Sequence, residues 1–294
     1  MSKIFYFLII TFGWSILIGL VFHFFAIPLS SPLGLTILAS LYMPSPAIAS
    51  IIMHRFRWKE ISQTYGLSPR KLNIKTLICS TVLFFTLFFS AYLLLILVFG
   101  NLLHVPSIGN ISLSINAIRD QIALTYGPAM AQSAKLPPVL LLFFISFIGA
   151  ITAGFSLNGL FALGEELGWR GFLWGQLRPY GTMGKIFVGV IWGLWHAPLI
   201  LLGYNFPHHP YWGILFMIFF TVLLTFPLID LRDKAHSVYA SSIVHGMINA
   251  SSLLSIIVIG SNELVGSLVG LVGCVAILCA WILANYGYGN VANN

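Results

Sequence analysis

Charged residues are rare in this sequence. Of its 294 residues, 7% are Asp, Glu, Lys or Arg, against roughly 25% in typical soluble domains, whereas 59% are apolar. This balance excludes an ordinary soluble domain and predicts an all-α, polytopic membrane protein embedded in a lipid bilayer. Only seven residues are acidic: Glu60, Asp120, Glu165, Glu166, Asp230, Asp233 and Glu263.

Two other features are missing. The three cysteines, Cys79, Cys274 and Cys279, lie in apolar runs, and an odd number without framework spacing excludes a disulfide-stabilised scaffold. The formal charge is +7, but the basic residues form no recognition motif, so we expect no nucleic-acid partner. No internal repeat or soluble domain is visible, so residues 1–294 are predicted to form a single membrane domain.

Long apolar runs dominate the chain instead. A membrane-spanning helix needs roughly 20 predominantly apolar residues. The first run is read as a retained span, because no convincing signal-peptide cleavage site follows it. The loop at about 100–137 is expected to carry a short surface helix. About eight transmembrane helices are predicted, at roughly 4–26, 34–54, 76–99, 138–163, 186–205, 211–230, 237–258 and 264–285.

The basic residues are distributed asymmetrically between the loops. With the N-terminus inside, the outer loops hold only Arg119 and Lys135. The positive-inside rule therefore predicts both termini in the cytosol, and a bacterial plasma membrane is the expected location. The residues on the inner side are Lys3, Arg55, Arg57, Lys59, Arg70, Lys71, Lys75, Arg178, Lys185, Arg232 and Lys234.

Two of the acidic residues are adjacent, in the stretch LGEELGWRGF that runs from Leu163 to Phe172. Glu166 and Arg170 are four residues apart, so on a helix they share a face and can pair. Glu165 points about 100° away and is left for another role. A purely structural ion pair is the alternative. The apolar run before Glu165 is longer than a bilayer requires, which leaves the depth of Glu165 open.

Two further motifs place polar side chains inside predicted spans, where they are costly and usually face a protein interior. Trp192 and His196 are one turn apart in WGLWHAPL, as are His245 and Asn249 in HGMIN. Both histidines are expected roughly 12–15 Å below the cytosolic surface, at 1.5 Å per residue. The motifs together predict an intramembrane polar cavity, although each could also be a simple packing contact.

Pairs of glycines at GxxxG spacing occur in two of the predicted spans. They are Gly189 with Gly193 and Gly266 with Gly270. Small residues at this spacing let two helices approach closely, so both pairs predict tight helix packing.

In this order, the three polar motifs resemble those of the CAAX-protease and bacteriocin-processing (CPBP) family of intramembrane glutamate-type proteases. EELGWR resembles the family's EExxxR signature, and HGMIN resembles its HxxxN motif. WGLWH resembles the motif with an aromatic residue four before a histidine, where Trp192 replaces the more common phenylalanine. The resemblance covers about residues 138–258, which is therefore the expected catalytic core.

The resemblance implies a CAAX-prenyl-protease-like endopeptidase that hydrolyses a peptide bond within the membrane. Glu165 would activate the attacking water, and His196 would help to position it. His245 and Asn249 would bind the oxyanion. The supporting residues would be Glu166, Arg170 and Trp192. Hydrolysis needs a base, a positioned water and aimed donors, and no GxSxG nucleophile motif lies near these residues.

Alternatives remain open at this point. Two Glu and two His could instead form a zinc site, but the HExxH helix is absent, so a mechanism without metal or other cofactor is favoured. The chain could also be a non-enzymatic bacteriocin-immunity or regulatory protein, or a transporter, although transporters often show repeats. The expected partners are a peptide or membrane-protein substrate, prenylated or not, and the bilayer.

Overall fold

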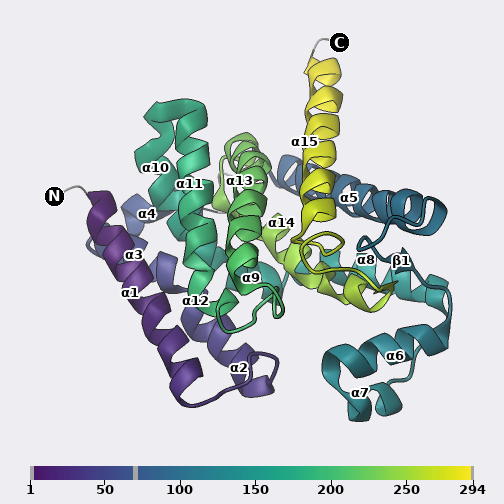
Figure 1. Ribbon diagram of the computed structural model, residues 1–294. Helices are drawn as coiled ribbons and strands as arrows, with labels where there is room; N and C mark the ends of the chain where they lie inside the picture. Colours follow the sequence, from purple (N-terminus) through teal and green to yellow (C-terminus); the bar gives the residue numbers. More distant parts are fainter. Residues whose placement is uncertain (1–2, 69–71, 293–294) are drawn as a thin grey trace.

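The computed structural model describes residues 3–68 and 72–292 as a bundle of helices (Figure 1). The α-helices are α1 (Lys3–Phe24), α2 (Pro32–Ile37), α3 (Ser45–Met53), α4 (Trp58–Thr64), α5 (Ile74–Leu95), α6 (Ile115–Tyr126), α7 (Pro128–Ser133), α8 (Val139–Gly154), α9 (Leu157–Glu166), α10 (Trp174–Leu177), α11 (Gly181–Trp195), α12 (Ala197–Ile200), α13 (Pro210–Ala235), α14 (Val238–Ala250) and α15 (Leu271–Ala292). The π-helices are η1 (Leu38–Tyr42), η3 (Ile96–Leu102) and η4 (Leu167–Leu173), and the 3₁₀ helices are η5 (Arg178–Tyr180) and η6 (Ser251–Ile256). Strands β1 (Asn110–Ile111) and β2 (Val258–Ile259) pair antiparallel.

Several helices are long and apolar enough to cross a membrane. Within the described residues there are five such stretches: Lys3–Phe24, Pro32–Met53, Ile74–Leu102, Leu157–Ile200 and Pro210–Ala235. The chain is therefore a helical, multi-pass membrane protein, as its composition predicted. The total of eight spans and the cytosolic position of both termini stay predictions.

The stretch Leu157–Ile200 folds back on itself. Its turn lies at η5 and Gly181, whose φ of 53° is in the left-handed region that favours glycine. The first half runs from α9 through η4 to α10, and the second half consists of α11 and α12, so that α10 and α11 lie side by side (Figure 1).

The predicted span 138–163 is wrong, because two helices occupy it. α8 ends at Gly154 and α9 begins at Leu157. A Cβ on Gly154 would lie 2.4 Å from Met247 Cγ, so α14 packs directly on the end of α8. The Ser156 hydroxyl then donates to the Thr152 carbonyl at 2.7 Å, a bond that competes with the helical ladder. The excess length of this apolar run is thus explained by a break within it.

Three other predicted boundaries also need correction. The span predicted at 186–205 begins earlier, at Gly181, where the turn ends, and the one at 237–258 is α-helical only to Ala250 before it tightens into η6. The span predicted at 264–285 begins at Leu271, because Gly266 lies in a turn against another loop. The loop at about 100–137 carries two surface helices, α6 and α7, where one was expected.

The two GxxxG pairs have different outcomes. Added Cβ atoms on Gly189 and Gly193 would lie 2.5 Å from Val222 Cα and Ile218 Cα, so α11 and α13 pack as closely as predicted. Gly266 is not helical, and its Cβ would lie 2.0 Å from the Ile108 carbonyl oxygen. For Gly266 and Gly270 the prediction of helix packing is therefore wrong, although Gly266 does meet a neighbouring backbone.

A third close approach lies within the acidic motif itself, at Gly164 and Gly168. A Cβ on Gly168 would lie 2.2 Å from Pro46 Cβ and 2.7 Å from the Pro46 carbonyl carbon. A Cβ on Gly164 would lie 3.0 Å from Pro44 Cα. The start of α3 therefore lies directly against α9 and η4, at the level of the adjacent carboxylates.

Gly168→Ala is expected to destabilise the protein by about 1–3 kcal/mol, because the α3 backbone must move to admit the new methyl group. Gly175→Ala is the matched control, because nothing lies within 4 Å of its added Cβ. Thermal unfolding in detergent micelles measures both. Equal unfolding temperatures for the two variants would show that the close approach is not a constraint.

Several of the basic residues predicted on the inner side lie where α4, η5, α11 and α13 meet. Arg178 is in η5, Lys185 is in α11, and Arg232 is near the end of α13. Three contacts connect these elements: Arg178 with Asp233 at 3.4 Å, Lys185 with Asp230 at 2.6 Å, and Arg232 with the Thr64 carbonyl at 3.3 Å. The surface formed by Arg178, Lys185 and Arg232, together with α4, is the basic face.

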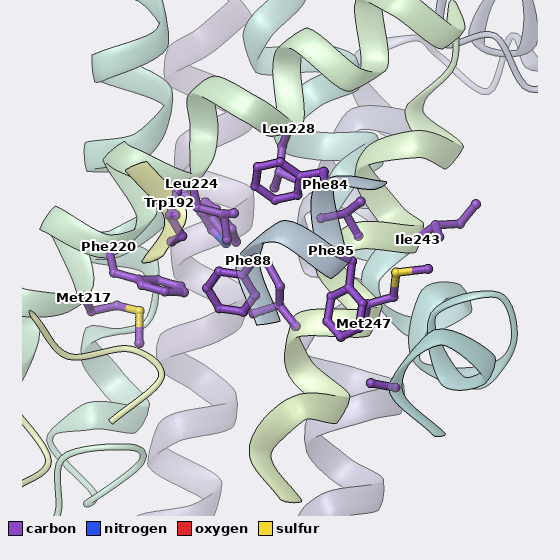
Figure 2. Packing of buried hydrophobic residues seen from close by; sticks show 14 of the residues in the cluster. Phe84, Phe85, Phe88, Trp192, Met217, Phe220, Leu224, Leu228, Ile243 and Met247 are labelled. Atoms are coloured by element: carbon purple, nitrogen blue, oxygen red, sulfur yellow. The ribbon is translucent and has the colours of Figure 1, made fainter. Parts of the chain in front are cut away.

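Buried apolar side chains fill the space between α5, α11, α13 and α14 (Figure 2). Trp192 is 2% exposed and belongs to this core. Its position is therefore set by packing, which matters because it also carries the contacts described next. The labelled members of the core are Phe84, Phe85, Phe88, Trp192, Met217, Phe220, Leu224, Leu228, Ile243 and Met247.

Candidate active site

The polar residues of the three motifs come from three neighbouring helical segments. Glu165 and Glu166 are the last two residues of α9, and Arg170 lies in the π-helix η4 that follows. Trp192 is in the last turn of α11, and His245 is in the middle of α14. π-Helical turns are uncommon and occur frequently at functional sites. Here the turn directly follows the adjacent carboxylates.

Glu166 forms the centre of a buried charged network. Its Oε1 accepts a hydrogen bond from Arg170 Nη1 at 2.9 Å and faces His245 Nδ1, also at 2.9 Å. Glu166 and Arg170 are fully buried, and His245 is 4% exposed. The predicted pair of Glu166 and Arg170 is therefore confirmed, and His245 is a third member that spacing alone did not indicate.

Arg170 is held by contacts on two more sides. Its guanidinium carbon lies 4.0 Å from the centre of the Trp192 ring, a cation–π contact. Its Nη2 donates to Thr225 Oγ1 on α13 at 3.2 Å. Thr225 was missed by the sequence reasoning, which considered ionisable groups. The sequence signal that could have indicated it is a pair of hydroxyl side chains, Thr221 and Thr225, which are one turn apart in an apolar span.

Glu165 points to a different partner. Its Oε2 accepts a hydrogen bond from Trp192 Nε1 at 2.8 Å, and the residue is 3% exposed. Glu165 thus does not share the ion pair of Glu166, in agreement with the angle of about 100° expected between successive helical residues. Its other carboxylate oxygen, Oε1, remains for a further donor.

Both histidine rings lie against Trp192. The ring centres of Trp192 and His245 are 5.2 Å apart, and those of Trp192 and His196 are 6.0 Å apart. His196 directly follows α11, and its Nδ1 lies 2.9 Å from the Trp192 carbonyl oxygen. The structure therefore brings both histidines to one side chain, in agreement with the similar depth predicted for them. The depth of Glu165 was left open by the sequence, and its hydrogen bond to Trp192 brings it to the same group.

The hydrogen-bond partners indicate which ring nitrogens carry protons. A carbonyl oxygen only accepts, so His196 Nδ1 donates to Trp192 and Nε2 is the acceptor in the neutral ring. A carboxylate also only accepts, so His245 Nδ1 donates to Glu166. In both rings it is Nε2 that remains to meet another group.

Residues from outside the three motifs complete the surroundings. Trp195 packs edge-on against His196, with ring centres 4.9 Å apart, and its Nε1 donates to Ser45 Oγ on α3 at 3.3 Å. Tyr42 donates to the Trp195 carbonyl at 2.5 Å. Ser45 and Tyr42 lie in the second apolar run, where no motif indicated a role.

The loop 201–209, between α12 and α13, lies near the Glu165 carboxylate. Burial raises the pKa of the Tyr204 hydroxyl in this loop, and the negative charge of Glu165 raises it further. Tyr204 therefore stays protonated near neutral pH and retains a donor hydrogen near the carboxylate. Phe206 anchors the loop, because it is fully buried against Gly213 of α13.

Asn249 is the predicted site residue that stands apart. It lies one turn after His245, near the end of α14, and its side chain is exposed. Among the described residues, the hydrogen bonds and ring contacts of the cluster do not reach it. A bound substrate would have to meet it directly, so its role stays a prediction.

The charged atoms of the cluster were also considered as metal ligands. Within residues 3–68 and 72–292, no group of three or more His, Cys, Asp or Glu side chains is arranged to hold a metal ion. Glu166 Oε1 already meets two donors, and Arg170 neutralises part of its charge. Whether the site works without a metal stays a prediction.

Comparison with known proteins identifies one family. Residues 135–251 match the model of the Rce1-like family, described as type II CAAX prenyl endopeptidase Rce1-like. This range contains all three motifs and overlaps the expected core at about 138–258. A search of the curated proteins finds no match. The resemblance deduced from the motifs is thus confirmed, and it indicates a protease of the CAAX type.

Proposed function

We propose, from the match of residues 135–251 to the Rce1-like family model, that this protein is an intramembrane endopeptidase that uses Glu165 as its base. One observation carries the proposal: Glu165, His196 and His245 all surround the buried side chain of Trp192, between α9, α11 and α14. Peptide hydrolysis needs a base, a positioned water and donors aimed at the developing oxyanion. The cluster contains groups of each kind.

Glu165 and His196 are proposed to hold the attacking water between them. Glu165 Oε1 accepts one hydrogen from the water while Trp192 holds Oε2 in place. His196 Nε2 accepts the other hydrogen, because its Nδ1 is committed to the Trp192 carbonyl. As the water attacks the peptide carbonyl, its proton moves to Glu165, which then donates it to the leaving amine.

His245 and Asn249 are proposed to stabilise the oxyanion. Asn249 donates from its side-chain amide, and His245 donates from Nε2 when the ring is doubly protonated. On the other side of the ring, Nδ1 donates to the Glu166 carboxylate at 2.9 Å, which fixes the direction in which Nε2 points. A single oxyanion donor typically contributes roughly 3–4 kcal/mol.

The substrate is proposed to be a peptide or membrane-protein segment, prenylated or not. It would reach the site from the bilayer, beside α9 and α14. Substrate trapping with Glu165→Gln in membranes tests this directly. Mass spectrometry should find new peptide termini in membranes with the wild-type protein and uncut, bound precursors in membranes with the variant. Identical peptide termini in both membranes would refute proteolysis at this site.

The non-enzymatic alternative makes the opposite prediction. A bacteriocin-immunity or regulatory protein would use the same polar cluster for binding, and Gln is nearly isosteric with Glu. Under that alternative Glu165→Gln keeps the cellular function while no peptide bond is cut. Measuring cleavage and the cellular phenotype with the same variant therefore separates the two functions.

Chelator treatment is expected to leave cleavage unchanged, because the carboxylates of the cluster are held by Arg170, His245 and Trp192. The measurement is the initial cleavage rate after dialysis against EDTA and 1,10-phenanthroline. A zinc metalloprotease assayed in parallel controls for chelator potency. Loss of activity that zinc restores would support the metal-dependent alternative instead.

A further inference from the structure

A polar pocket opens on the basic face, and it shares no residue with the candidate active site. It has a volume of about 340 Å³ and is lined by Lys59, Ser62, Gln63, Gly66, Ser68 and His236. Hydroxyl, amide, imidazole and ammonium groups all line it, and no carboxylate belongs to this described lining. Such a lining favours an anion with several acceptor oxygens.

The pocket is formed by α4, the segment that follows it and the turn after α13, and backbone contacts hold these segments together. Gly66 and His236 both have left-handed φ, at 66° and 52°, and a Cβ on Gly66 would lie 1.8 Å from the His236 carbonyl oxygen. The Val238 amide donates to the Tyr65 carbonyl at 3.0 Å, and Arg232 donates to the Thr64 carbonyl at 3.3 Å. The pocket is therefore preformed.

The nearby charges favour an anion. Glu60, the acidic residue of α4, is engaged by His54 at 3.2 Å and by Arg57 at 3.7 Å. Lys59 is exposed at the rim. Behind the pocket, Arg232 pairs with Asp233 at 2.7 Å, and Arg178 contacts the same carboxylate at 3.4 Å, so two cations face one anion there. The Nε of Arg232 is buried and has no hydrogen-bond partner within the described residues. The local charge around the pocket is therefore positive.

Aromatic side chains beside the pocket indicate where it lies relative to the bilayer. Phe56 is 63% exposed and Trp58 is 60% exposed, directly before Lys59 in the chain. Exposed Trp in a membrane protein is typical of the level of the lipid headgroups, and basic residues there attract anionic lipids. A lipid phosphate group would be within reach of this pocket at that level.

We propose that this pocket binds the phosphate headgroup of an anionic phospholipid, with Lys59 as its principal cationic contact. The hydroxyls of Ser62 and Ser68 and the amide of Gln63 donate to the phosphate oxygens. Trp58 and Phe56 pack against the upper acyl chain. Binding at this site is independent of proteolysis, so its test does not require a substrate.

The test is a titration of the purified full-length protein in neutral detergent with fluorescently labelled phosphatidylglycerol. Lys59→Gln is expected to weaken binding about fivefold, the typical contribution of one basic residue near an anionic lipid surface. Lys135→Gln is the matched control, because Lys135 is also exposed but lies in the loop before α8. Ser62→Leu, which fills the pocket and removes no charge, should weaken binding as well.

Two further arms separate the sources of the phosphate. Phosphatidylcholine with the same label should bind more weakly than phosphatidylglycerol, and millimolar inorganic phosphate should not displace the bound lipid. Displacement by inorganic phosphate would assign the pocket to a free anion and overturn the proposal. Equal affinities of the Lys59→Gln and Lys135→Gln variants would overturn it too.

Discussion

Glu165→Gln is expected to lower the cleavage rate by about 10²- to 10⁴-fold, the usual contribution of a positioned general base. Gln keeps the shape of the side chain and can still accept the hydrogen bond from Trp192 Nε1, which is 2.8 Å long in the wild type. What it loses is the ability to take a proton from water. The loss should therefore fall on kcat, with folding and membrane insertion unchanged.

The measurement is the initial rate of cleavage of a substrate identified by trapping, with the protein in lipid vesicles. Glu60→Gln is the matched control, since the same atoms change in a side chain that is 48% exposed on the surface. Its rate should equal that of the wild type. If Glu165→Gln also cleaves at the wild-type rate, the carboxylate is structural and the proposed base is wrong.

The pairing of the adjacent carboxylates could be predicted because it is a local property of a helix. Residues four apart share a face, so Glu166 and Arg170 were expected to meet, and Glu165 was expected to point elsewhere. Both expectations agree with the structure. Arg170 Nη1 lies 2.9 Å from Glu166 Oε1, and Glu165 Oε2 accepts a hydrogen bond from Trp192 Nε1. The grouping on three helices was predicted from the similar depth of the two histidines and from the resemblance between motifs, because spacing within one helix carries no information about its neighbours.

The partners of the motif residues could not be predicted in the same way. His245 was expected to face substrate, yet its Nδ1 meets Glu166, and that contact depends on how α14 crosses α9. The approach of α3 depends on Gly164 and Gly168, which look like ordinary residues of an apolar run. Tertiary packing decides such contacts, and a single sequence does not encode them as a local pattern.

Hydropathy could not predict the helix boundaries either. The run at 138–163 is continuous in apolar character, but Gly154 and Ser156 end one helix and begin another. Hydropathy measures how apolar a segment is, and it does not report where the helix axis changes direction. The break matters for function, because it lets α9 and η4 take their own course between α3 and α14 and so positions both glutamates.

Arg170→Met is expected to destabilise the protein by about 3–5 kcal/mol, the typical result of removing one partner of a buried ion pair. Glu166 and Arg170 are both fully buried, so the variant leaves a buried carboxylate with His245 as its remaining hydrogen-bond partner. The cation–π contact with Trp192, at 4.0 Å, is lost as well. Because Trp192 holds Glu165, cleavage should fall together with stability.

A double variant separates the cost of the unpaired charge from the loss of packing. Glu166→Gln combined with Arg170→Met removes both charges, so it should be more stable than Arg170→Met alone, because the cost of a buried unpaired carboxylate disappears.

Arg178→Met is the surface control. Its pair with Asp233 spans 3.4 Å, with side chains 60% and 31% exposed, and such pairs typically contribute roughly 0–1 kcal/mol. Thermal unfolding in detergent micelles compares the three variants. If Arg170→Met unfolds at the same temperature as Arg178→Met, the ion pair does not hold the site together, and Glu166 must be stabilised by His245 alone.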